Sequence, residues 1–349
     1  MLFRSTSDQN ELRALARQIL SDATSLERMK EIAATESGTD LDLWRTMADA
    51  GLVGIAMGEN VGGAGLGIIE ASVVLEEIGR TAARVPAFAV MALAAPALAG
   101  KPELLAGVAS GEVVITAAIH EPVGDAYAPT TTVAEGRLTG TKVCVPHGLI
   151  AKRFVVTASD GVYAVEADDP GVTVTRSDTT SGVPDALVEF NGAKATCVGG
   201  PQAVVDLVNR GVSAAAIMTS GACQEALRLM AEYTKGRKQF DKVIASFQAV
   251  SQRAGDAYID TEGVRLTAWQ AAWRLSEGLP ADEALMSAKF WAAEGGWRVM
   301  HGAHHVHGGV GVDRDYPLHR YFLLHKQLEL QLGSAQPSLL RLGRLLVGS

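Results

Sequence analysis

RFVVTASDGVYAVEADDPGVTVTR, residues 153–176, is the stretch that decides the fold of this chain. Its apolar, β-branched runs are short and are separated by Gly, Asp or Pro, which is the pattern of strands joined by turns. EVVITAAI and RLTGTKVCV before it, and ALVEFNG after it, have the same character. We therefore predict an antiparallel β-domain over residues 112–200, most simply a small sandwich or barrel.

Helical periodicity surrounds this β-region on both sides. Before it, apolar residues recur at helical spacing, and IIEASVVLEEIGR, residues 68–80, predicts an amphipathic helix that stops at Gly79. After Pro201 the same period returns and continues to the C-terminus. The predicted class is α+β, with a helical domain over residues 1–111, the β-domain over 112–200 and a second helical domain over 201–349.

Composition and charge exclude several classes of protein. The 349 residues are 48% hydrophobic and 20% charged, which is typical of a globular chain and not of a disordered one. The net charge of −8 argues against binding to nucleic acid. The longest uncharged apolar stretch, between Arg84 and Lys101, contains two prolines and is too short to span a bilayer. With three scattered cysteines and no apolar leader at the N-terminus, we expect a cytoplasmic protein.

Two motifs invite a cofactor or metal interpretation but do not carry one. GGAGLG, residues 62–67, lacks the GxGxxG spacing of a dinucleotide site and follows a helical pattern, so we expect a tight loop between helices. His301, His304 and His305 would share one helix face, as two histidines of a metal site do. No carboxylate lies within the cluster, so we expect histidines at a helix end or against a ligand, and no metal.

A stronger signal comes from two segments of the C-terminal region taken together. YTKGRKQFDKVIASFQAV, residues 233–250, predicts a helix–turn–helix, and HHVHGGVGVDRDYPLHR, residues 304–320, follows about 60 residues later. An arginine can bind phosphate oxygens with two hydrogen bonds, and a Gly-Gly pair lets backbone approach a bulky ligand. Either segment alone is better explained by an arginine paired with a carboxylate in a plain helical hairpin.

Together with earlier motifs, these segments resemble the acyl-CoA dehydrogenase family over nearly the whole chain. The resemblance begins at GLVGIAMGENVGGAGLGIIEASVVLEEIGR, residues 51–80, and includes HEP at 120–122 and GTK at 140–142. It implies an N-terminal helical domain, a central β-domain and a C-terminal four-helix bundle. It also implies FAD bound between subunits, an acyl-CoA substrate oxidised at Cα and Cβ, and an electron-transferring flavoprotein as acceptor.

The chain departs from the family pattern where the base and the flavin ring are expected. The commonest family base falls at Leu332, and the position used by a smaller group falls at Gly211, so the resemblance assigns no catalytic base to this chain. Where the family places Thr or Ser before Glu-Pro, and Trp-Ile-Thr after Gly-x-Lys, this chain has His120 and Cys144-Val145-Pro146. Proline has no N–H and cysteine no stacking face, so the ring pocket is expected to be lost.

The other half of the family's flavin site is better kept. In the family, the matching residues reach across to the pyrophosphate and adenosine end of a neighbouring subunit's FAD. The cofactor-binding residues that the resemblance implies are Arg237, Phe240, Gln248, His305, Val306, His307, Gly308 and Gly309. His305 replaces a usual Gln and Asp241 a usual Gly, and an aspartate beside a pyrophosphate would repel it unless turned away.

Because this chain keeps one half of the family's flavin site and has lost the other, we expect two related chains to supply one half each. Some actinobacterial family members are α₂β₂ tetramers that act on bulky substrates such as steroid side-chain CoA esters, and our hypothesis is that this chain is the non-catalytic partner. The alternative is a self-sufficient FAD enzyme with a relocated base, Glu329 or less favourably Glu232. A third interpretation is a scaffold that has lost flavin altogether.

Overall fold

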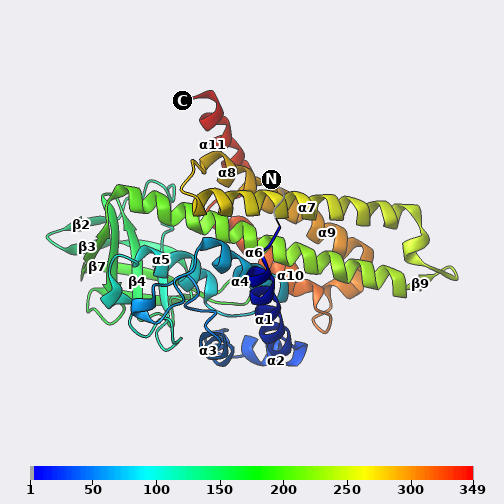
Figure 1. Ribbon diagram of the computed structural model, residues 1–349, viewed down its shortest axis with the longest axis horizontal. Helices are drawn as coiled ribbons and strands as arrows, with labels where there is room; N and C mark the ends of the chain where they lie inside the picture. The colour runs from blue at the N-terminus through cyan, green and yellow to red at the C-terminus, as the bar shows by residue number, and fades with distance from the viewer. Residues whose placement is uncertain (1–3, 349) are drawn as a thin grey trace. The chain divides into compact units, whose positions relative to one another are not determined.

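The computed structural model describes residues 4–348, and its element order confirms the predicted succession of helices, strands and helices (Figure 1). The N-terminal helices are α1 (Ser7–Ala23), α2 (Leu26–Ala33), α3 (Leu41–Asp49), α4 (Ile68–Thr81) and α5 (Ala95–Ala97), with short 3₁₀ or π-helical turns at η1 (Glu59–Val61), η2 (Phe88–Ala94) and η3 (Pro102–Leu105). The strands of the central region are β1 (Ile115–Ala118), β2 (Thr132–Ala134), β3 (Arg137–Pro146), β4 (Arg153–Ala158), β5 (Gly161–Glu166), β6 (Val172–Ser177), β7 (Asp185–Lys194) and β8 (Thr196–Gly199).

The C-terminal region is helical apart from one small hairpin. Its helices are α6 (Pro201–Gly236), α7 (Gln248–Ser276), α8 (Asp282–Phe290), α9 (Gly296–His307), α10 (Leu318–Leu330) and α11 (Ala335–Val347), and its hairpin strands are β9 (Lys238–Gln239) and β10 (Lys242–Val243). Short turns of 3₁₀ or π helix lie at η4 (Ile244–Ser246), η5 (Trp291–Gly295) and η6 (Gly308–Val312). None of the helices within residues 4–348 is long and apolar enough to cross a membrane.

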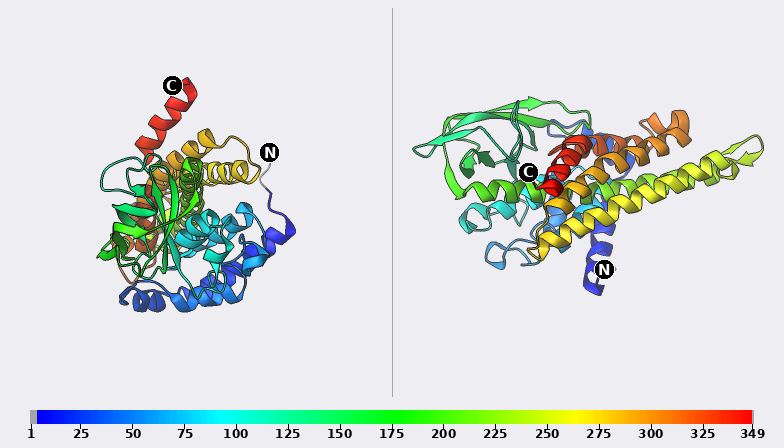
Figure 2. Two further views of the ribbon diagram at one scale, coloured as in Figure 1. Left: turned by 90° about the vertical axis from the view of Figure 1, so that its left-hand side faces the viewer. Right: turned by 90° about the horizontal axis from the view of Figure 1, so that it is seen from above.

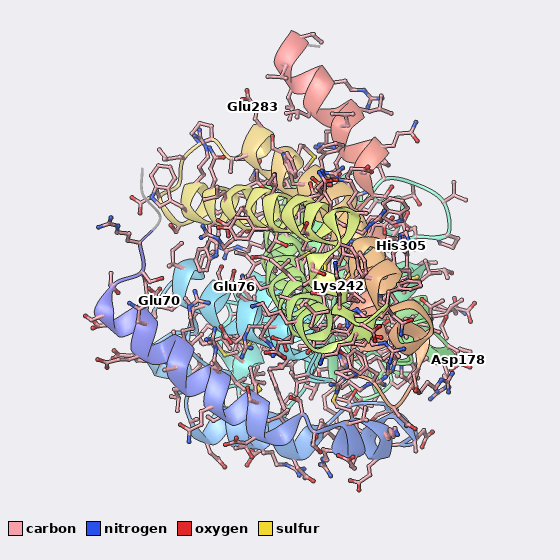
Figure 3. The ribbon with its side chains drawn as sticks, turned by 90° about the vertical axis from the view of Figure 1, so that its right-hand side faces the viewer. Glu70, Glu76, Asp178, Lys242, Glu283 and His305 are labelled. Atoms are coloured by element: carbon pink, nitrogen blue, oxygen red, sulfur yellow. The ribbon has the colours of Figure 1, made fainter. Side chains whose placement is uncertain are left out.

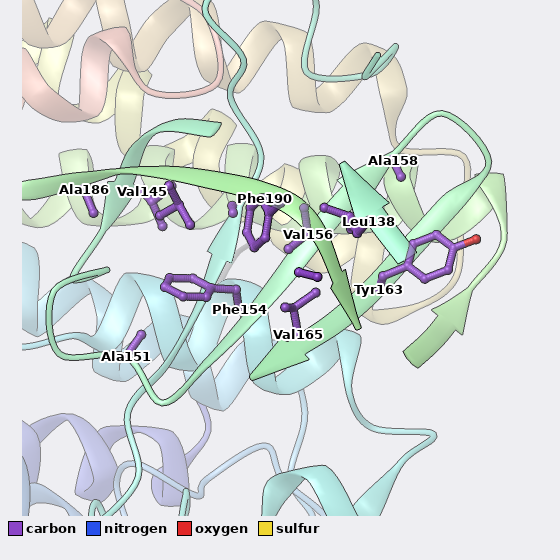
Figure 4. Packing of buried hydrophobic residues seen from close by; sticks show 13 residues of the cluster. Leu138, Val145, Ala151, Phe154, Val156, Ala158, Tyr163, Val165, Ala186 and Phe190 are labelled. Carbon is purple, nitrogen blue, oxygen red and sulfur yellow. The ribbon is translucent and has the colours of Figure 1, made fainter. Parts of the chain in front are cut away.

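The central β-domain consists of two four-stranded sheets, with orders β1-β4-β5-β8 and β2-β3-β7-β6. Alternate residues of both sheets fill one apolar core, in which the rings of Phe154 and Phe190 meet edge to face at 6.1 Å (Figure 4). One pairing differs from the antiparallel prediction, because β1 runs parallel to β4. The chain passes through β2 and β3 of the other sheet between these strands, and so β4 can re-enter in the same direction as β1.

A buried ion pair ties the HEP and GTK segments together inside this β-domain. Lys142 is fully buried, and its Nζ donates to Glu121 Oε1 at 2.8 Å, Thr157 Oγ1 at 3.0 Å and the Ile119 carbonyl at 3.2 Å. Glu121 also accepts hydrogen bonds from the backbone and hydroxyl groups of Thr130 and Thr131. All three ammonium protons therefore have acceptors, as a buried lysine requires.

The contacts between residues divide the chain into two compact units that cut across the predicted domains. One unit combines the beginning of the chain to residue 28, residues 72–83 and the chain from residue 212 onward, and the other combines residues 29–71 and 84–211. The predicted boundaries at residues 111 and 200 stay a prediction.

Gly79 does not end the fourth helix as the sequence predicted, since α4 continues to Thr81. A Cβ on Gly79 would lie 2.0 Å from the carbonyl oxygen of Met218, and one on Gly221 would lie 1.9 Å from that of Glu76. Both glycines thus serve the close crossing of α4 and α6, where two backbones touch and no side chain fits. The sequence pattern marks Gly79 as the end of the helix, but in the structure Gly79 is a packing residue inside it.

The long helices α6 and α7 run side by side and are joined at one end by the β9–β10 hairpin (Figure 2). The sequence predicted a plain helix–turn–helix at this place. Instead of a simple turn, the residues between the two helices form an antiparallel hairpin, with Lys242 opposite Gln239 and Val243 opposite Lys238. This hairpin carries part of the predicted cofactor segment beyond the ends of both helices.

Candidate functional site

The hairpin between α6 and α7 begins at Arg237. The Arg237 N–H donates to the Tyr233 carbonyl at 2.8 Å, which extends the helical hydrogen bonding of α6, and its own carbonyl accepts from the Ile244 N–H at 2.8 Å. Phe240 and Asp241 form the two-residue turn, both with positive φ, 53° and 60°. Such turns favour Asn, Asp or Gly, so an aromatic residue here is held against its preference, and its side chain is 87% exposed.

The second element of the site is the end of α9. Gly308, with φ at 60°, ends this helix, and its N–H donates to the carbonyls of His304 and His305. A Cβ added to Gly308 or Gly309 would meet no atom within 4 Å. The glycine pair therefore leaves open space directly in front of the backbone, where a ligand can approach more closely than it could past a side chain.

An open cavity of about 640 Å³ lies between these two elements. Its lining residues are Tyr233, Arg237, Gln239, Ile244, His305, Val306, His307, Gly308, Gly309, Val310 and Asp313. The structure thus brings six of the eight predicted cofactor residues into one cavity, namely Arg237 and the run from His305 to Gly309 (Figure 3 labels His305). Phe240 at the hairpin tip and Gln248 at the start of α7 are outside the lining, and their role stays a prediction.

Five lining residues were missed by the sequence reasoning. Tyr233 could have been found, because it lies four residues before Arg237 at the end of α6 and its carbonyl accepts the helical hydrogen bond of Arg237. Gln239 and Ile244 face the cavity only because the hairpin pairs as it does, and no sequence signal marked Val310 or Asp313.

The charge that Arg237 places at the cavity suits the binding of an anion there. Within residues 4–348, no carboxylate forms an ion pair with the exposed Arg237 guanidinium. Asp241, the expected source of repulsion, is not part of the lining, although Asp313 contributes one carboxylate to it. The cavity fits a phosphate-bearing ligand such as the pyrophosphate half of FAD, because it offers a free guanidinium and a glycine pair. Its volume is within the usual range for small-molecule sites.

The histidines of α9 make backbone contacts instead of gathering around a metal. The Nδ1 atoms of His301, His304 and His307 lie 2.9, 2.9 and 2.7 Å from the carbonyl oxygen four residues earlier. Burial lowers the pKa of both His304 and His307. Among the described residues, no group of three or more His, Cys, Asp or Glu side chains is arranged to hold a metal ion.

The two positions at which the resemblance places a family base hold no ionisable group. Leu332 is buried, with φ at 59°, in the short loop between α10 and α11, and Gly211 lies inside α6. Glu329, the substitute considered from the sequence, is ion-paired with Lys326 at 2.5 Å. The other substitute, Glu232, is ion-paired with Arg228 at 2.5 Å. Both substitute carboxylates are thus engaged by a neighbouring cation.

The strand expected to face a flavin ring is irregular in this chain. Cys144 has φ at 51° within a register shift of β3, and Pro146 pairs with Asp185 of β7. Burial raises the pKa of Asp185 to about 6, and among the described residues its Oδ1 is buried without a hydrogen-bond partner. A strand with no N–H at Pro146 has one backbone donor fewer with which to hold a flavin ring.

Comparison with known proteins identifies the family. The N-terminal domain of acyl-CoA dehydrogenases matches residues 6–112, and the C-terminal domain matches residues 200–346. Acyl-CoA dehydrogenase FadE27 of Mycobacterium tuberculosis is 41% identical over 99% of this chain and 98% of its own length. The chain belongs to the acyl-CoA dehydrogenase family. This confirms the predicted fold class, and FAD is the cofactor of the family.

Two solved structures are similar to this chain over nearly its full length. One is the ChsE4–ChsE5 complex from Mycobacterium tuberculosis, with a TM-score of 0.95, 40% identity and 100% coverage of both chains. The other is a variant of the Tcur3481–Tcur3483 steroid ACAD, with a TM-score of 0.93, 39% identity and 98% coverage of both. Each is named as an assembly of two different proteins.

Proposed function

We propose that this chain is the non-catalytic subunit of a two-chain, FAD-dependent acyl-CoA dehydrogenase. It contributes the adenosine and pyrophosphate half of the flavin site, and a homologous subunit contributes the ring pocket and the base. The observation that carries the proposal is the contrast between the cavity around Arg237 and the base position at Leu332. The naming of similar structures as two-protein assemblies supports the same division.

FAD, when bound, supplies the acceptor for the hydride that leaves the β-carbon of an acyl-CoA thioester. On this chain, the Arg237 guanidinium would bind phosphate oxygens, and the open space in front of Gly308 and Gly309 would admit the cofactor. Tyr233 and Ile244 would cover apolar parts of the cofactor. The α-proton of the substrate would have to be removed by the partner subunit, because Leu332 cannot accept a proton.

The substrate and acceptor follow from relatives and are part of the proposal. One similar structure is named a steroid ACAD, which favours a bulky, steroid-like acyl-CoA. An electron-transferring flavoprotein is the acceptor expected for the family. We propose an α₂β₂ assembly in which each pair of chains holds one flavin.

The test is to co-express this chain with a homologous catalytic subunit, and to measure FAD per pair of chains and the Kd for FAD. Arg237→Ala should weaken binding about 10- to 150-fold, the effect of losing hydrogen bonds to a charged group. Lys238→Ala is the matched control, because it removes an adjacent exposed cation that is outside the cavity lining. Unchanged affinity in Arg237→Ala, or one flavin per chain in this protein purified alone, would refute the proposal.

A further inference from the structure

His307, the last residue of α9, is buried with both ring nitrogens engaged. Its Nδ1 lies 2.7 Å from the Ala303 carbonyl oxygen, and its Nε2 lies 3.0 Å from the Tyr316 hydroxyl. A carbonyl can only accept, so Nδ1 carries the ring proton. In the neutral ring Nε2 is then an acceptor, and the Tyr316 hydroxyl donates to it.

A third ring completes the cluster and connects it to the other wall of the cavity. The ring of Tyr233 stacks on His307, with 4.3 Å between the centroids and 24° between the planes. Tyr316 meets the edge of the same Tyr233 ring at 6.3 Å. Tyr233 belongs to α6 and accepts the backbone hydrogen bond of Arg237, while His307 directly precedes Gly308. The three rings therefore link the end of α6, which Arg237 directly follows, to the end of α9, which the glycine pair directly follows.

We propose that Tyr316 is a positioning residue of the flavin site: its hydroxyl holds the His307 ring in one orientation and so fixes the spacing between Arg237 and the Gly308 backbone. This inference rests on the proposed function. Tyr316 does not line the cavity, so it acts through His307 and not by touching the cofactor. Tyr316 lies in the quoted segment 304–320 but beyond the predicted cofactor residues, nine residues after His307 and past η6.

The hydrogen bond predicts a dependence on pH. Burial lowers the pKa of His307, while the hydrogen bond between its Nδ1 and the Ala303 carbonyl raises it. Protonation of Nε2 would reverse the direction of the other hydrogen bond, because Nε2–H would then donate and the Tyr316 hydroxyl would accept. The bond to the charged ring is the stronger of the two. Other groups act on the cluster, namely His304 on α9 and Glu232 and Arg228 on α6. They are present in the wild type and in the variant alike.

The experiment measures the Kd for FAD in the two-chain complex at neutral and at mildly acidic pH. Tyr316→Phe removes only the hydroxyl and should weaken binding about two- to tenfold at neutral pH, as for one hydrogen bond. On acidification the wild type keeps the link, now donated by Nε2–H, while Tyr316→Phe leaves that buried N–H without an acceptor. The ratio of the two Kd values should therefore widen as the pH falls. Tyr163→Phe is the control, because it loses one tyrosine hydroxyl bond, to Asp160, in the β-domain.

Two results would overturn the inference. A ratio that stays constant with pH would mean that Tyr316 only packs, and an effect no larger than that of Tyr163→Phe would mean that it does not act on the site. If Arg237→Ala weakens FAD binding while Tyr316→Phe does not, only this inference fails. If neither variant changes the Kd, the proposed function fails with it.

Discussion

Replacing Lys142 by methionine tests how strongly the buried ion pair holds the β-domain. Methionine fills a similar volume but leaves the Glu121 carboxylate, 8% exposed, without its cation, and leaves the Ile119 carbonyl with one donor fewer. Breaking a buried pair by removing one partner typically costs about 3–5 kcal/mol. Glu121 keeps its bonds from Thr130 and Thr131, so we expect the lower half of this range.

Hydrogen–deuterium exchange read by mass spectrometry on peptides from β3 and β4 is the suitable assay, because it reports local opening inside one domain of a larger assembly. A loss of about 3 kcal/mol corresponds to exchange roughly 150-fold faster. Lys152→Met changes an exposed lysine of the same domain and should alter exchange by less than about threefold. Equal exchange in the two variants would refute the reasoning that the pair holds the segments together.

Three further predictions follow from individual residues. The donors around Glu121 hold its pKa at about 2. The stability that the Glu121 carboxylate contributes is therefore present above the ordinary glutamate pKa and should be lost as the pH falls from there toward 2. Acid denaturation of the wild type and of Glu121→Gln would measure this loss. Gly221→Ala should destabilise the protein by several kcal/mol, because its Cβ would overlap the backbone of α4, whereas Gly255→Ala in α7 meets nothing within 4 Å and should stabilise it by up to about 1 kcal/mol; thermal denaturation of the two compares them directly. Glu329→Gln should leave turnover of the assembled enzyme nearly unchanged, and loss of turnover with normal flavin content would restore Glu329 as the base.

The sequence predicted the order of elements because its signals there were local. Alternation and turn residues between residues 112 and 200 mark strands in any context. Gly79 shows the limit of local reading, because whether a helical glycine stops a helix or receives a neighbouring backbone depends on the crossing with α6. The parallel pairing of β1 with β4 is likewise decided between strands that are distant in sequence.

The candidate site was predictable where the family motif is contiguous, and not where packing brings in distant residues. Arg237 and the run from His305 to Gly309 meet in one cavity as the resemblance implied. Asp313 enters the cavity through the 3₁₀ turn that follows the glycines, and Tyr316 acts from behind it. Neither position could be read from spacing, because a turn of irregular backbone has no fixed period to extrapolate.

The exposed Phe240 at the hairpin tip has a consequence for how the protein must be handled and made. An aromatic ring that is 87% exposed at the end of a projecting hairpin is a ready contact for any apolar surface. A preparation that contains this chain without a binding partner should therefore self-associate as its concentration rises, and more so in sulfate salts that strengthen apolar contacts. A cell gains from synthesising such a chain in step with whatever protein covers that ring, since an excess would be exposed to aggregation and proteolysis.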